Sequence, residues 1–257
     1  MALLDLGGIR LFYTVKGEGT PIVFIHPPLL TSANFHYQLD ELSQKFKVIT
    51  FDIRGHGRSE YSVQTITYPL IVDDMRHLLD HLGIDKAFLC GYSTGGSIVL
   101  EFLKTHSARA LGGIVISGMS EVCDWYLEKR ISLASLLSKE GTIRLLSLVI
   151  SWGNSNTKET FMGMYREALK GDARNIEQYY RYSLQYNCTH QLETIDHPVL
   201  LVFGTKDKSF HKYAQILHEK LPHNQLKFIN EKHQIPTKAA IELNQLIDDF
   251  LLTTQTE

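Results

Sequence analysis

Short apolar runs recur along the chain and are separated by longer stretches that mix apolar and polar residues. The runs are rich in β-branched and aromatic side chains and show no polar alternation, which is typical of strands buried on both faces of a sheet. We expect strands at residues 11–15, 22–25, 48–51, 87–90, 114–117, 199–203 and 226–229.

Most of the intervening stretches place their apolar residues at helical spacing. Helices are expected near residues 35–44, 66–82, 96–106, 212–221 and 239–252. Strands that alternate with helices predict an α/β fold, in which helices flank both faces of a mostly parallel central sheet. Ligands of such folds bind at the carboxyl ends of the strands.

The alternation stops between residues 119 and 193, where the sequence is polar, aromatic and helical in character. An insertion of this length between two strands predicts a helical cap over the active edge of the sheet. We therefore divide the chain into a core domain, residues 1–118 and 194–257, and a cap, residues 119–193. Two interpretations of the cap's aromatic residues stay open: they line an apolar pocket, or they pack the cap against itself and the core.

The composition narrows the class of binding partner. The chain has 257 residues, of which 44% are hydrophobic and 21% charged, and its formal net charge is −2. That length and hydrophobic content suffice for one well-buried α/β domain with an insertion. No long run of Lys or Arg supplies the positive surface that binds nucleic acid or an anionic membrane. We expect a small, neutral or moderately apolar molecule as the partner.

The sequence contains no uninterrupted stretch of about 18 apolar residues, and its N-terminal segment lacks the basic and apolar parts of a signal peptide. These features predict a cytoplasmic protein with no membrane-spanning helix. The cysteines, Cys90, Cys123 and Cys188, form an odd and scattered set. We expect free thiols rather than disulfides.

The sequence Gly91-Tyr92-Ser93-Thr94-Gly95 follows an expected strand directly and precedes an expected helix directly. The pattern Gly-x-Ser-x-Gly in that position predicts a sharp turn that holds the serine side chain clear of its neighbours. Glycine at both flanks permits the close packing and unusual backbone angles of such a turn. Ser93 is therefore the candidate nucleophile.

A serine needs a base and an orienting acid to attack a carbonyl group at neutral pH. Asp207 and His233 each follow an expected strand, and the chain order Ser, Asp, His is that of hydrolases with a nucleophile elbow. We predict that His233 is the base and Asp207 the acid. Glu121 and Asp124, which follow another expected strand, are alternative positions for the acid.

Five motifs, taken together, resemble one family. They are Pro21-Ile22-Val23-Phe24-Ile25-His26, Asp52-Ile53-Arg54-Gly55-His56-Gly57-Arg58-Ser59, Gly91-Tyr92-Ser93-Thr94-Gly95, Gly204-Thr205-Lys206-Asp207, and His233. The chain resembles the α/β-hydrolase superfamily, in particular its serine esterase-like branch with a helical cap, over nearly its whole length. The resemblance implies that Ser93 attacks an acyl carbon, that His233 takes up and returns the proton, and that Asp207 holds the imidazole. It implies no metal ion and no organic cofactor.

The resemblance also implies an oxyanion hole made of two backbone N–H groups. Thr94, which follows the nucleophile, supplies one of them. The family normally has His-Gly-x after its third strand, and x supplies the second. This chain has His26-Pro27-Pro28-Leu29 instead, and Pro28 has no N–H to donate. We expect Leu29 N–H to take this place; a side chain, a water molecule or slow ester hydrolysis are the alternatives.

A serine at the elbow excludes the activities of this fold that need a carboxylate nucleophile, such as those of haloalkane dehalogenases and epoxide hydrolases. The predicted function is a serine hydrolase that cleaves a small to medium, mainly apolar carboxylic ester, lactone or related acyl compound through an acyl-enzyme. The alternative is a ligand sensor or signalling partner of the same fold with slow or incidental turnover. His77 and His81 lie four residues apart on an expected helix, but no third metal ligand can be placed beside them, so we interpret them as surface residues.

Overall fold

The computed structural model describes residues 2–254, whose strands form one sheet in the order β1-β2-β4-β3-β5-β6-β7-β8. The strand β2 pairs with β1 and β4 in antiparallel fashion, and all other neighbours are parallel. The strands are β1 (Ala2–Asp5), β2 (Arg10–Lys16), β3 (Pro21–Ile25), β4 (Lys47–Phe51), β5 (Ala87–Tyr92), β6 (Ala110–Ile116), β7 (Val199–Gly204) and β8 (Asn224–Ile229). The predicted mostly parallel sheet is confirmed.

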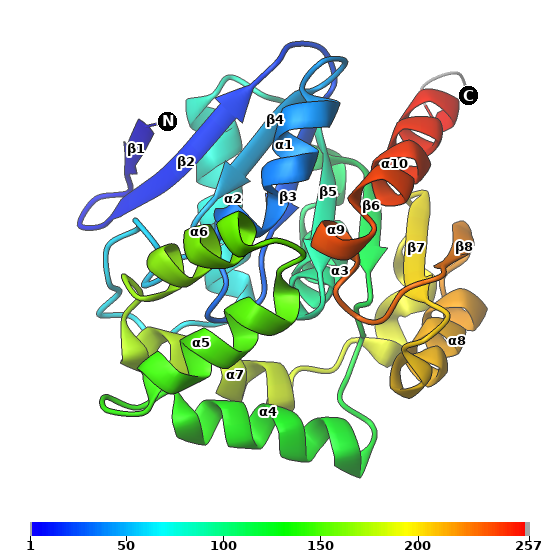
Figure 1. Ribbon diagram of the computed structural model, residues 1–257. Helices are drawn as coiled ribbons and strands as arrows, with labels where there is room; N and C mark the ends of the chain where they lie inside the picture. The colour runs from blue at the N-terminus through cyan, green and yellow to red at the C-terminus, as the bar shows by residue number, and fades with distance from the viewer. Residues whose placement is uncertain (1, 255–257) are drawn as a thin grey trace.

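Helices cover both faces of this sheet (Figure 1). The α-helices outside the insertion are α1 (His36–Leu42), α2 (Tyr68–His81), α3 (Thr94–Thr105), α8 (His211–Lys220), α9 (Ile235–Lys238) and α10 (Ala240–Thr254). Short 3-10 helices form at η1 (Ser32–Phe35), η2 (Ser107–Arg109), η3 (Thr189–Thr194) and η4 (Lys208–Phe210).

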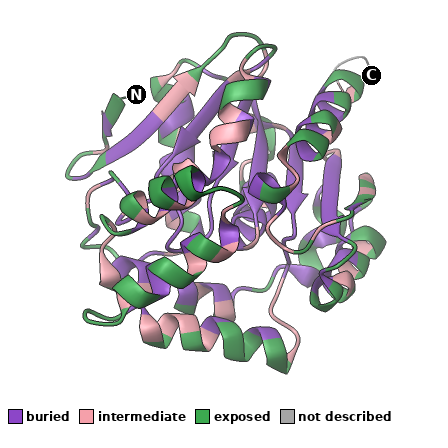
Figure 2. Ribbon diagram, in the orientation of Figure 1, coloured by how far each residue is buried: buried purple, intermediate pink, exposed green. Residues whose placement is uncertain are grey.

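The central strand β5 shows why the strand sequences are apolar without interruption. Successive residues of a strand point to opposite faces of the sheet. Ala87 and Leu89 pack with side chains of α2, α3 and α8, whereas Phe88 and Cys90 pack with side chains of α1 and α10. All residues of β5 are buried, as the strands in the middle of Figure 2 show. A strand enclosed on both faces needs apolar residues at every position.

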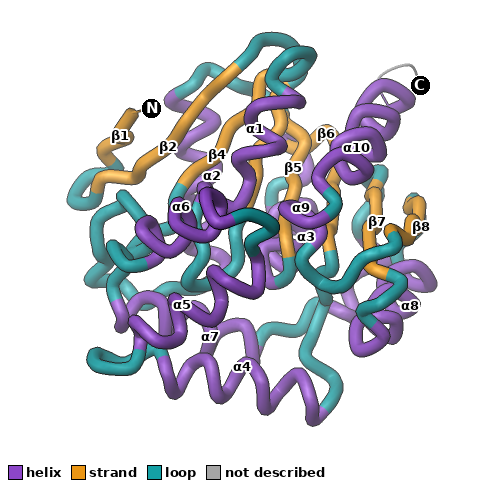
Figure 3. The backbone as a smooth tube through the Cα atoms, viewed as in Figure 1, coloured by secondary structure: helices purple, strands orange, loops and turns teal. Residues whose placement is uncertain are grey.

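Between β6 and β7 the chain forms four consecutive helices, which we call the inserted helices. They are α4 (Trp125–Leu137), α5 (Ile143–Asn154), α6 (Lys158–Ala168) and α7 (Ala173–Gln185). Asp124, Thr157 and Asp172 begin α4, α6 and α7 as N-cap residues, and the side chain of each accepts a backbone N–H of the first turn. The inserted helices lie together beside the carboxyl ends of the parallel strands (Figures 1 and 3).

Three features differ from the sequence expectation. The strand β1 was not expected, because it is a short edge strand in which only Leu4 is buried. The four-residue helix α9 was also missed. The expectation that residues 226–229 are buried on both faces is wrong, since β8 is the other edge of the sheet and Lys227 and Phe228 are exposed. Edge strands lack the fully apolar pattern that made the other strands recognisable.

Candidate active site

Ser93 lies at the turn between β5 and α3, where its backbone has φ 55° and ψ −122°. A positive φ is strained for a residue with a side chain, and such strain concentrates at functional sites. The flanking glycines are required by space. A Cβ atom on Gly91 would lie 2.1 Å from the carbonyl oxygen of Gly95, and a Cβ atom on Gly95 would lie 2.2 Å from that of Ile25. The turn therefore packs too tightly for any larger residue at either glycine.

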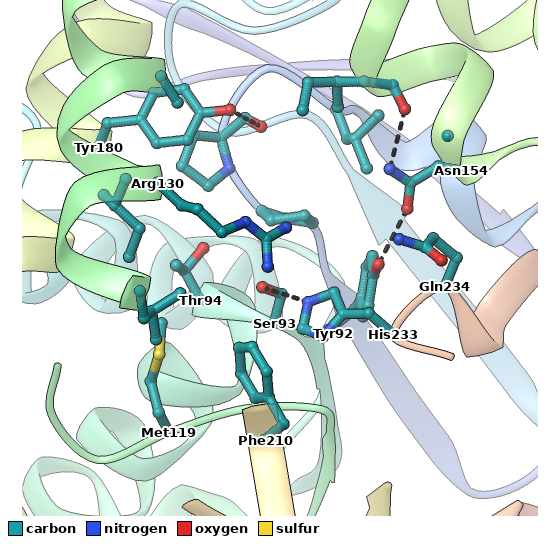
Figure 4. Close-up of a pocket in the computed structure, with 18 of the residues that line it drawn as sticks. Tyr92, Ser93, Thr94, Met119, Arg130, Asn154, Tyr180, Phe210, His233 and Gln234 are labelled. Atoms are coloured by element: carbon teal, nitrogen blue, oxygen red, sulfur yellow. Dashed lines mark hydrogen bonds between the residues drawn. The ribbon is translucent and has the colours of Figure 1, made fainter. Parts of the chain in front are cut away.

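The structure brings Ser93, His233 and Asp207 into one chain of hydrogen bonds. His233 Nδ1 is 2.7 Å from Asp207 Oδ2, and His233 Nε2 is 3.1 Å from Ser93 Oγ. Because a carboxylate only accepts hydrogen bonds, Nδ1 holds the proton and Nε2 is free to accept the serine hydroxyl. The loops after β5, β7 and β8 supply the three side chains, so they meet at one edge of the sheet although the sequence separates them widely (Figure 4).

Asp207 is held in its charged form. Burial by itself raises the pKa of its carboxyl group, but the hydrogen bond and charge of His233, a hydrogen bond from Ser209 and the charge of Arg130 together outweigh burial and lower that pKa. The imidazole of His233 is fixed between two aromatic rings, with centroids 4.3 Å away for Phe210 and 5.4 Å away for Tyr92. The ring thus has a defined orientation toward both partners.

The two alternative acids are engaged elsewhere. Asp124 caps α4 through Leu127 N–H, and its second oxygen accepts a hydrogen bond from the hydroxyl of Tyr213. Glu121 accepts a hydrogen bond of 2.6 Å from the side-chain amide of Asn187. Neither has a hydrogen bond with His233, so the geometry favours Asp207 as the partner of that histidine.

The loop after β3 carries the second unusual backbone conformation of the site. Leu29 has φ 70° although its side chain is buried in the core. No described residue accepts a hydrogen bond from its backbone N–H. Two tyrosines of α7 fix this loop: the hydroxyl of Tyr179 donates to the carbonyl oxygen of His26 at 3.0 Å, and that of Tyr180 donates to the carbonyl oxygen of Pro28 at 3.3 Å.

Residues 52–59 form a buried support beneath the site. The carboxylate of Asp52 accepts the backbone N–H groups of Ser32 and Arg58 at 2.8 and 2.9 Å. His56 lies against His26, with a centroid separation of 5.3 Å. Burial lowers the pKa of His26 to about 4, and burial together with the neighbouring His26 lowers the pKa of His56 to about 3. Both rings are therefore neutral near pH 7.

A pocket with a volume of about 320 Å³ opens above Ser93. Ligand pockets span roughly 300–1,000 Å³, so this one suits a small molecule. The core contributes Pro27, Pro28, Leu30, Tyr92, Thr94, Met119, Phe210 and Gln234 to its wall; the inserted helices contribute Leu127, Arg130, Ile131, Ala134, Val149, Ile150, Gly153, Asn154 and Tyr180. The wall is mainly apolar, and Arg130 is its one guanidinium among the described residues (Figure 4).

The aromatic residues of the insertion do little to form this pocket. Tyr180 is the member of that set that lines it, whereas Trp125 and Trp152 are 70% and 67% exposed. Aliphatic side chains of α4 and α5 line it instead. Sequence reasoning missed Arg130 and Asn154, because the face that a helix turns toward a pocket is set by packing rather than by a local motif.

The described residues contain no cluster of three or more His, Cys, Asp or Glu side chains that could hold a metal ion. His77 and His81 are exposed, and His81 Nε2 lies 3.1 Å from the hydroxyl of Tyr13. None of the helices within residues 2–254 is both long enough and apolar enough to cross a membrane. The three cysteines are free.

Residues 20–151, just over half of the chain, match the family model described as alpha/beta hydrolase fold. The chain belongs to this α/β-hydrolase family. The crystal structure of the enol-lactonase from Burkholderia xenovorans LB400 has the same fold, with a TM-score of 0.87 and 18% identity over 98% of this chain and 100% of that chain.

Two relatives of this α/β hydrolase differ in how much of each protein they match. The serine hydrolase BPHL of Homo sapiens is 27% identical over 97% of this chain and 86% of that protein. The AB hydrolase superfamily protein YisY of Bacillus subtilis is 30% identical over 42% of this chain. That match spans 41% of YisY, which is less than half of its length.

Proposed function

We propose that this α/β hydrolase is a serine hydrolase that cleaves a small carboxylic ester, lactone or related acyl compound through an acyl-enzyme. The observation that supports this most directly is the continuous hydrogen-bond chain from Ser93 through His233 to Asp207, at 3.1 and 2.7 Å. A strained nucleophile turn with its base and acid in hydrogen-bond reach is the arrangement that acyl transfer requires. The full-length similarity to a serine hydrolase adds support.

In the proposed acylation, Ser93 Oγ attacks the carbonyl carbon while His233 Nε2 removes the hydroxyl proton. The carbonyl π electrons move to oxygen and form a tetrahedral oxyanion. When the oxyanion collapses, the bond to the alcohol oxygen breaks, and the imidazolium returns the proton to that oxygen. Asp207 stabilises the imidazolium and keeps its Nδ1 proton in place. In deacylation a water molecule repeats these steps as the nucleophile and frees the acid and Ser93.

The oxyanion requires hydrogen-bond donors near Ser93. Thr94 begins α3, so its backbone N–H is one of the groups at a helix N-terminus that have no partner within the helix. We propose that Leu29 N–H is the second donor, because it is unpaired among the described residues and its positive φ sets it in a loop held by Tyr179 and Tyr180. This loop follows Ile25, whose carbonyl group touches Gly95 of the elbow.

A fluorophosphonate probe tests the nucleophile directly, whichever ester is the substrate. We expect the probe to phosphonylate the wild-type protein at Ser93, as located by mass spectrometry of the digest. Ser93→Ala should abolish labelling and lower ester hydrolysis on the order of 10⁴- to 10⁶-fold. Ser107→Ala removes an exposed serine outside the site and should label like the wild type.

Labelling at another serine, or none in a protein with an intact circular dichroism spectrum, would contradict the proposal. The second result would favour the ligand sensor that the sequence leaves as the alternative. The outcome does not depend on which ester is supplied, because the probe needs only a working nucleophile, base and oxyanion site.

A further inference from the structure

Arg130 is the feature of the pocket that ester hydrolysis by itself does not use. It lies on α4, and Figure 4 shows its guanidinium pointing into the pocket, toward Ser93. No carboxylate within residues 2–254 forms an ion pair with it. Its contact with a described side chain is a cation–π contact with Tyr126, whose ring centroid is 5.5 Å from the guanidinium carbon. Its five N–H donors are thus available to a ligand.

The surroundings of Arg130 favour an anion. No Asp or Glu lines the pocket, and Leu127, Ile131 and Ala134 form its wall on the same helix. The carboxylate that lies deeper, Asp207, already binds His233 and Ser209. A guanidinium among apolar side chains attracts a carboxylate more strongly than one surrounded by bulk water, and its planar fork matches the two carboxylate oxygens.

We propose that the substrate is an anionic acyl compound and that Arg130 binds a carboxylate of the substrate while Ser93 attacks its ester or lactone carbonyl. This assignment rests on the proposed hydrolase function and adds a substrate class to it. The pocket volume of about 320 Å³ keeps the two groups of the substrate within one small molecule. Arg130 is then a residue that binds substrate and determines specificity, separate from the three residues that perform the acyl transfer.

Two matched ester pairs test the substrate class. The first pair is phenyl hydrogen adipate and the corresponding primary amide, which place a carboxylate or a neutral isostere in the acyl part. The second pair is 4-carboxyphenyl butanoate and 4-carbamoylphenyl butanoate, which place it in the alcohol part. We expect the wild type to prefer the anionic member of at least one pair by about 10-fold or more in kcat/KM, mainly through a lower KM. Equal rates within both pairs would overturn the proposal.

Variants at position 130 assign the preference to the guanidinium. Arg130→Met keeps the length of the side chain and removes its charge, so we expect the ratio of kcat/KM for the anionic and neutral esters to fall to about one. Arg130→Lys should recover part of that ratio, because an ammonium group keeps the charge without the planar fork. The matched control is Lys129→Met, which removes the same charge from the next residue of α4. Lys129 is exposed and does not line the pocket, so this variant should behave like the wild type.

Three further outcomes separate the proposal from its rivals. If Arg130→Met lowers kcat equally for the anionic and neutral esters, the guanidinium acts on the oxyanion, and carboxylate recognition is refuted. If Lys129→Met lowers the ratio as much as Arg130→Met, general charge attraction explains the preference, and the proposal also fails. If no ester is cleaved, the proposed function fails by itself; calorimetric titration with adipate then decides, since binding that Arg130→Met abolishes supports the anion site and absence of binding refutes it.

Discussion

At the scale of single residues, the hydrogen bond between His233 and Asp207 decides which nitrogen of the imidazole holds the proton. Its length of 2.7 Å and the lowered pKa of the Asp207 carboxyl group, in which the effects of His233, Ser209 and Arg130 outweigh burial, indicate a charge-assisted bond. With Nδ1 protonated, Nε2 faces Ser93 with a lone pair. Loss of the carboxylate charge would remove the preference for this tautomer.

We therefore predict that Asp207→Asn lowers kcat by about 10³- to 10⁴-fold, by analogy with other catalytic triads. The decrease should be smaller than that caused by Ser93→Ala, because the nucleophile itself remains. Steady-state kinetics with a phenyl ester, together with a melting temperature for each variant, measure it. Asp124→Asn and Glu121→Gln are matched controls, and we expect both to keep most of the activity. A larger decrease in either control would assign the acid to the loop after β6 instead.

Sequence alone could place some of these residues and not others. Ser93, Asp207 and His233 each follow a strand that an apolar run makes recognisable, and the carboxyl ends of parallel strands meet at one edge. Arg130 has no such local signal. It is one charged residue on a helix whose neighbours Lys129 and Glu128 are also charged, and only packing shows which of them faces the pocket. The positive φ of Leu29 depends likewise on the surrounding chain.

At the scale of elements, α7 connects the insertion to the loop that we propose forms half of the oxyanion site. Its residue Asn175 exchanges two hydrogen bonds with the backbone of Ser62, at 2.7 and 3.0 Å. One helical turn later, Tyr179 and Tyr180 donate to the carbonyl groups of His26 and Pro28. The helix is thus tied to the core on both sides of the pocket wall, and it holds the loop that contains Leu29.

This arrangement predicts that Tyr179→Phe lowers kcat and kcat/KM together, by about 10-fold. The variant removes the hydrogen bond that holds the carbonyl group of His26, so the loop that contains Leu29 loses a fixed position while the pocket wall stays intact. An interaction that matters mainly in the transition state changes kcat and leaves KM nearly constant. The measurement is a full Michaelis–Menten analysis with one ester substrate.

Tyr182→Phe is the matched control on the same helix. Tyr182 is half-buried and stacks near Tyr68 and Tyr186, and its hydroxyl has no hydrogen-bond partner among the described residues. We expect wild-type kinetics for this variant. Equal kinetic effects of both substitutions would mean that α7 stabilises the fold in general and does not position the loop in particular.

Element prediction from sequence succeeded where burial is complete and failed at the edges. The runs that became β3, β5 and β7 are apolar throughout because both faces are covered. The insertion was expected as helical from residue 119 to 193, and its four helices follow that expectation, but the number and direction of helices depend on contacts between distant segments. The division into a core domain and a cap stays a prediction.

At the scale of the whole molecule, the buried pair His26 and His56 lies between the end of β3, the segment 52–59 and α7. His26 Nδ1 donates to the carbonyl oxygen of Pro27 at 2.9 Å, and its Nε2 accepts the backbone N–H of Ile53 at 2.9 Å. His56 Nδ1 donates to the carbonyl oxygen of Arg54 at 3.0 Å. Protonation of either ring would place a charge in a buried site, and for His26 it would break the bond to Ile53. The folded state therefore excludes protons that the unfolded chain accepts.

Stability should consequently fall in mild acid. The pKa values of His26 and His56 in the folded state are about 4 and about 3, mainly because of burial, against 6.5 for an unperturbed histidine. Since both are lowered, the stability contributed by the neutral rings is complete above about pH 6.5 and is lost as the pH falls toward these values. By pH 5 each histidine should cost about 2 kcal/mol of unfolding free energy.

Urea unfolding at pH 7.5 and pH 5.0 tests this, with the difference between the two free energies as the readout. His56→Phe keeps a ring beside His26 and Tyr179 and removes one titrating group, so its loss on acidification should be about 2 kcal/mol smaller than that of the wild type. Tyr179→Phe is the control, because it removes a buried hydrogen bond that does not titrate between these pH values; it should lower stability by about 1 kcal/mol at both. If His56→Phe loses as much stability as the wild type between the two pH values, the folded protein admits the proton at His56, and acid instability must originate in other groups.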